Sequence, residues 1–182
     1  MEVGMNPRGS QSSDAVEASG RAIARAVVYA RFSGGTLVLL GLLSALVSAR
    51  HPVSAGFAIS VAVVANGVIE LREAARLRRH DPRAPRRMAL NQLALGLEIA
   101  AYSAWQVYAV TPEMVQQLLA RPMVAGVLEL VEPAVLEAVV ALVPPMIRLL
   151  YLIVGFVAVA GCGAVAWFYR SRSRHLAALA GR

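Results

Sequence analysis

The stretch that decides the fold is MIRLLYLIVGFVAVAGCGAVAWFY, residues 146–169. Arg148 is its one charged residue. A helix of about 24 residues rises about 36 Å, which is enough to cross the ~30 Å hydrocarbon core of a bilayer. The stretch therefore predicts a transmembrane helix.

Three more apolar blocks of similar length precede it, at residues 32–49, 52–71 and 89–110. The chain as a whole is 58% hydrophobic and 16% charged, with a mean hydropathy of +0.59. A soluble domain needs more polar surface than this to cover its core. We therefore expect an all-α membrane protein whose four transmembrane helices form one domain over residues 32–169. Only Arg50 and His51 separate the first two blocks, so these should pair as a tight hairpin.

The charge distribution predicts the orientation. The 18 basic side chains are all arginines, and most of them precede the first block, lie in residues 72–88 or follow the last block. Because arginines accumulate on the cytoplasmic side, both termini should be cytoplasmic and residues 72–88 should form a basic cytoplasmic loop, with the chain in the cell's inner membrane. We expect six arginines of that loop to contact anionic lipid headgroups: Arg76, Arg78, Arg79, Arg83, Arg86 and Arg87. Topology accounts for the net charge of +7 without a nucleic-acid partner.

The two ends of the chain are more polar. Residues 1–13 have the composition of a disordered tail. Residues 14–31 predict a cytoplasmic amphipathic helix that leads into the membrane, with Ser13 or Asp14 as its cap. Residues 170–182 form a basic cytoplasmic tail.

The outer segment, residues 111–145, is too apolar for an ordinary loop and contains five prolines. Prolines divide it into pieces too short to span a bilayer. We expect short interfacial helices between spans three and four, the first starting at Thr111-Pro112-Glu113. A re-entrant pore element and an oligomer contact remain alternatives.

A row of polar residues marks the third span. Glu98 lies near its middle, and Asn91, Tyr102 and Gln106 follow the same helical face at offsets of seven, four and four. An ionisable group at that depth is costly and is by default a candidate for function. Glu98 is therefore the centre of a candidate polar stripe.

The second span contributes Asn66 and Glu70, four residues apart. If spans two and three pack together, these residues should lie closer to Asn91 and Gln92 than to Glu98. The amides can serve as interhelical hydrogen-bond partners. Glu70, near the expected helix end, is most simply paired with arginine or reaching the headgroups.

Signatures of catalysis are missing from the sequence. It has no nucleotide-binding glycine loop, nucleophile elbow or zinc-protease motif. Cys162 is the single cysteine, and His51, His80 and His175 lie in separate flanking segments. We expect no enzyme activity, no cofactor and no metal, although an intramembrane enzyme stays open.

Two functional classes remain. The first is an oligomeric channel or transporter for cations or protons, with the polar stripe around Glu98 lining the route. The second is a non-transporting scaffold or accessory subunit that binds partner membrane proteins. Both classes predict contact with anionic lipid headgroups and association with a second copy or another membrane protein.

Overall fold

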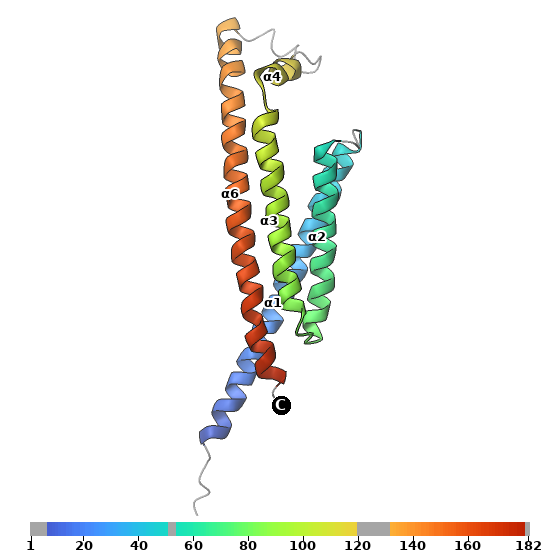
Figure 1. The fold of residues 1–182 in the computed structure, drawn as a ribbon, viewed down its shortest axis with the longest axis vertical. Coiled ribbons are helices and arrows are strands. Elements are labelled where there is room, and N and C mark those ends of the chain that lie inside the picture. The colour runs from blue at the N-terminus through green and yellow to red at the C-terminus, as the bar shows by residue number, and fades with distance from the viewer. Residues whose placement is uncertain (1–6, 51–53, 120–131, 181–182) are drawn as a thin grey trace, which may run out of the picture. The chain divides into compact units, whose positions relative to one another are not determined.

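The computed structural model describes residues 7–50, 54–119 and 132–180, and it is helical throughout apart from turns and short connections (Figure 1). No strand occurs in these ranges, which confirms the all-α expectation. The helices are α1 (Pro7–Ser48), α2 (Ala55–Arg78), α3 (Ala84–Ala109), α4 (Pro112–Leu119) and α6 (Pro133–Ala180).

Within these described ranges, three helical stretches are long and apolar enough to cross a membrane: Val16–Ser48 of α1, the whole of α2, and α6. The third span expected at residues 89–110 corresponds to α3. That helix is long enough, but its mean hydropathy is lower because it contains Asn91, Gln92 and Glu98. The fourth span therefore stays a prediction.

Helix α1 begins at Pro7, upstream of the expected cap at Ser13 or Asp14. Proline suits the first turn of a helix, where its missing N–H is not needed. No further proline follows before Ser48, so the expected amphipathic segment and the first span form one helix. Residues 7–13 are thus helical, so the prediction of a disordered tail is wrong for them, and residues 1–6 of the predicted tail lie outside the described residues.

Residues 72–88 are mostly helical, and the prediction of a basic loop over this whole range is wrong. Helix α2 continues to Arg78, and α3 starts at Ala84. In the turn between them, His80 adopts a φ of 59° and donates its N–H to the Leu77 carbonyl at 3.0 Å. Arginine is a good helix former, so a run of arginines does not end a helix.

The outer segment is partly as expected. Helix α4 starts at Pro112, and the Thr111 hydroxyl accepts a hydrogen bond from the Met114 N–H at 3.3 Å. Residues 133–145, however, belong to α6, which runs unbroken through Pro144 and Pro145, so the predicted break there is wrong. Two prolines remove two hydrogen-bond donors but leave the other backbone bonds of the helix in place.

The chain divides into two compact units. Unit 1 comprises residues 1–95 and 161–182. Its core draws on four helices and adjoins the arginine-rich segments: Ile23, Ala26, Val27, Ala30, Ala74, Leu77, Ala84, Met88, Ala89, Ala166, Tyr169 and Leu176. The buried apolar core of the unit therefore lies beside the arginine-rich segments.

Helices α1 and α2 pack as the expected hairpin. A Cβ atom at Gly67 would lie 2.8 Å from the Gly34 carbonyl oxygen, and one at Gly41 would lie 2.7 Å from a Val64 methyl carbon. Contacts this short need glycine on the facing surfaces, as in close helix pairs within membranes.

Unit 2 comprises residues 96–160, with the rest of α3, helix α4 and the first part of α6. Gly155 packs against Ser103, where an added Cβ would lie 3.2 Å from the serine Cβ. The Arg148 guanidinium donates to the Val110 carbonyl at 2.8 and 3.2 Å. These contacts join α6 to the second half of α3.

Candidate functional site

Glu70 is the centre of the most buried polar group in unit 1. Its side chain is fully buried, with an exposed fraction of 0%. One carboxyl oxygen accepts a hydrogen bond from the Tyr169 hydroxyl at 2.6 Å, and the other accepts one from the Gln92 amide at 2.6 Å. The Ser33 hydroxyl of α1 also reaches the carboxyl. Side chains from α1, α3 and α6 thus meet on one residue of α2; we call these four residues the Glu70 cluster.

A second buried contact joins α2 to α3 beside this cluster. The Asn91 amide donates to the backbone carbonyl of Asn66 at 3.1 Å. The Asn66 amide donates to the Ala62 carbonyl one turn earlier at 2.9 Å. The predicted proximity of Asn66 and Glu70 to Asn91 and Gln92 is confirmed.

The interpretation of Glu70 as an arginine-paired residue at a helix end is wrong. Helix α2 continues about two turns beyond it, to Arg78, so Glu70 lies inside the helix. None of the ion pairs among the described residues includes Glu70, and its hydrogen-bond donors Gln92 and Tyr169 are neutral groups. Glu73, one turn on, is the acidic partner of Arg76 and Arg87, at 2.5 and 3.8 Å.

This arrangement is suited to holding helices together. Both carboxyl oxygens are occupied by donors from other helices, so the group is satisfied within the protein. Removing a donor would leave a buried polar atom unpaired, which typically costs about 1–3 kcal/mol. The cluster therefore fixes how α2, α3 and α6 pack in unit 1.

Sequence reasoning missed Tyr169. It lies 99 residues from Glu70 along the chain, at the end of the apolar stretch of α6. The available signal was weak: a tyrosine at a membrane boundary usually finds a hydrogen-bond partner for its hydroxyl. Which partner it finds depends on how α6 packs.

The stripe around Glu98 is divided between the two units. Asn91 belongs to unit 1, whereas Glu98, Tyr102 and Gln106 belong to unit 2 and are half-buried. The Gln106 amide donates to the Tyr102 hydroxyl at 2.6 Å, and the Tyr102 ring packs edge-on to Tyr151 at 6.2 Å. The structure thus brings Tyr102 and Gln106 together and associates Asn91 with the second span.

The arginines expected at the headgroups lie at the ends of α2 and α3. All six are exposed, and two of them, Arg76 and Arg87, pair with Glu73.

The described residues contain no group of three or more His, Cys, Asp or Glu side chains that could hold a metal ion.

Comparison of the chain with protein-family models, with curated proteins and with solved structures finds no match. The fold and the buried cluster nevertheless define a class. Within the residues that the structure describes, the chain is a helical protein with three helices long and apolar enough to span a membrane. Buried polar contacts join one of them, α2, to α3 and to α6.

Proposed function

We propose that the chain is a four-span protein of the cell's inner membrane, with both termini in the cytoplasm, that serves as a self-assembling, non-transporting scaffold. The four-span arrangement is supported by the direction of the chain. Helices α2 and α6 both end in arginine-rich segments, so both should end on the cytoplasmic side. The chain must return to the outside between Arg78 and Pro133, and α3 is the long helix described in that interval.

The observation that carries the assembly role is a heptad pattern on α6. Apolar residues recur at alternating spacings of three and four: Leu136, Val139, Val143, Met146, Leu150, Ile153, Val157 and Ala160. We call this row the α6 seam. Such spacing is typical of one helix packing along another. Met146, Leu150 and Ile153 of the seam are exposed, so the residues that the structure describes leave this face open.

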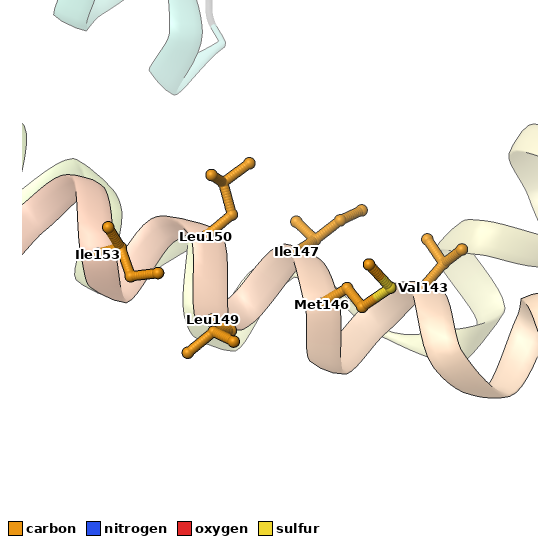
Figure 2. Close-up of a pocket in the computed structure, with 6 residues that line it drawn as sticks. All are labelled: Val143, Met146, Ile147, Leu149, Leu150 and Ile153. Atoms are coloured by element: carbon orange, nitrogen blue, oxygen red, sulfur yellow. The ribbon is translucent and has the colours of Figure 1, made fainter.

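Figure 2 shows the middle of the α6 seam. Val143, Met146, Ile147, Leu149, Leu150 and Ile153 line a shallow groove along one helix, and all of them are apolar. A second helix with the same seam would fill it, and a second copy of this chain supplies one.

The length of α6 provides a driving force for this contact. Arg148 and Arg170 bracket about 21 residues, or about 32 Å of helix, which matches the hydrocarbon core. Residues 133–147 would then extend about 22 Å beyond that core. Exposed apolar side chains there, such as Leu142 and Met146, are facing water unless another chain covers them.

Cysteine cross-linking in the full-length Cys162→Ala protein tests the assembly. Met146→Cys lies on the α6 seam and is 67% exposed, whereas the control Leu152→Cys is 58% exposed on the other side of the helix. In dilute proteoliposomes, oxidation should give disulfide-linked dimers with Met146→Cys and few with Leu152→Cys. Equal yields for both variants, or none for Met146→Cys, would contradict self-assembly through the seam.

A cation or proton channel is the second candidate. It is supported by Glu98, Tyr102 and Gln106, which are half-buried along one face of α3 within unit 2. Flux into liposomes is the test, with wild type beside Glu98→Gln. Flux that depends on Glu98 would favour the channel. The absence of flux through a correctly inserted wild-type protein would favour the scaffold.

A further inference from the structure

We propose that unit 1 contains a binding site for a phospholipid with an anionic headgroup, in a groove between the start of α3 and the end of α6. The proposal rests on the four-span insertion argued above. It goes beyond general attraction of arginines to the membrane surface, because it assigns one lipid to one groove.

The groove has a charged end and an apolar end. Helices α3 and α6 run antiparallel here (Figure 1), so Arg86 near the start of α3 and Arg170 near the end of α6 belong to one end of the lining. Leu93 and Gly163 belong to the other end. The distance from Arg86 to Leu93 along the helix is about 10 Å. Leu90 and Trp167 complete the apolar part of the lining.

The two arginines are available for a ligand. Arg76 and Arg87 are partly neutralised by Glu73, but none of the ion pairs among the described residues involves Arg86 or Arg170. Both side chains are exposed. Guanidinium groups bind phosphate oxygens in a bidentate manner, so two of them at one end of a groove match a phosphodiester.

The apolar end fits an acyl chain. A Cβ atom added at Gly163 would meet nothing within 4 Å, so the glycine leaves open space. Trp167 is 72% exposed at the rim, where tryptophan commonly lies at the level of the headgroups. A free phosphate or an acidic peptide would make no use of an apolar extension at membrane depth. The combination therefore favours a lipid.

Trp167 provides the measurement. The chain has two tryptophans, so Trp105→Phe leaves Trp167 as the single reporter. The full-length protein is reconstituted in phosphatidylcholine vesicles that contain brominated phosphatidylglycerol or, at the same mole fraction, brominated phosphatidylcholine. We expect phosphatidylglycerol to quench Trp167 preferentially. Removing one arginine should weaken this preference about fivefold, the effect of one basic residue near an anionic surface.

Two matched sets of variants distinguish lipid binding in the groove from general attraction to the positively charged surface. Arg86→Gln with Arg170→Gln should abolish the preference, whereas Arg78→Gln with Arg83→Gln removes the same charge outside the groove and should retain it. Gly163→Phe should fill the apolar end and reduce quenching. Gly161→Phe, at a second glycine with open space around its Cβ that does not line the groove, should not.

Three outcomes would overturn the proposal: equal quenching by the two lipids, a preference that survives Arg86→Gln with Arg170→Gln, or its complete loss on adding inorganic phosphate, which would indicate a free-anion site. Failure of membrane insertion is a separate result. In that case neither brominated lipid would quench Trp167, or Trp105 in the Trp167→Phe protein.

Discussion

Tyr169 of α6 donates a 2.6 Å hydrogen bond to Glu70 of α2, across 99 residues of sequence. Gln92 of α3 donates to the other carboxyl oxygen, so three helices meet at one buried group. Polar contacts of this kind contribute most to stability where no water can replace a partner that is lost. The cluster therefore predicts how unit 1 responds to substitution.

Tyr169→Phe should destabilise the protein by about 1–3 kcal/mol, because it leaves one oxygen of a buried carboxyl without its donor. The measurement is helix loss during titration with a denaturing detergent, followed by circular dichroism. Tyr108→Phe is the control, since Tyr108 is 82% exposed and should tolerate the change. Equal stability of the two variants would mean that the contact with Glu70 contributes little.

Gly67→Ala should loosen the α1–α2 hairpin. The new methyl group would lie 2.8 Å from the Gly34 carbonyl oxygen and 2.9 Å from the Val38 backbone nitrogen, so the helices must move apart. Overpacking of this kind costs roughly 1–3 kcal/mol. Gly35→Ala makes the same change where a Cβ would meet nothing within 4 Å, so it should be neutral or stabilising. Detergent denaturation of both variants checks this, and a stable Gly67→Ala protein would contradict the close packing.

The pKa of Glu113 should lie below its usual range. The Thr111 side chain bonds to this carboxyl in the first turn of α4, and that bond lowers the pKa because it favours the charged form. A lowered pKa in the folded state means that the contribution to stability is present at neutral pH and is lost as the pH falls through the folded-state pKa. NMR titration of the carboxyl carbon should show the pKa rising in Thr111→Val. An unchanged pKa in that variant would exclude Thr111 as the cause.

Cysteine accessibility should place the two ends of α3 on opposite sides of the membrane. In a Cys162→Ala background, Glu113→Cys should react with a membrane-impermeant thiol reagent added outside intact cells, and Arg83→Cys should react only after the cells are opened. Both positions are exposed in the structure, so burial does not bias the comparison. Labelling of both from outside would refute the crossing by α3.

Local chemistry was enough to predict the helices of this chain, although not where several of them begin and end. The apolar blocks predicted helices because their length and composition require them. The start of α4 followed from Thr111 and Pro112, and the expected packing of spans two and three predicted that Asn66 and Glu70 lie close to Asn91 and Gln92. These features depend on neighbours within a few turns of helix, and the sequence contains that information directly.

Packing between distant segments decided the rest. The sequence pointed to Glu98 as the central ionisable residue because it lies in mid-span, whereas Glu70 is the most buried carboxyl among the residues that the structure describes. Its burial depends on the continuation of α2 to Arg78 and on Tyr169, which reaches it only when α6 packs against α2. The unbroken helix through Pro144 and Pro145 likewise contradicts the local rule. Side chains from four helices meet at Glu70, and no local sequence pattern encodes which side chains will meet.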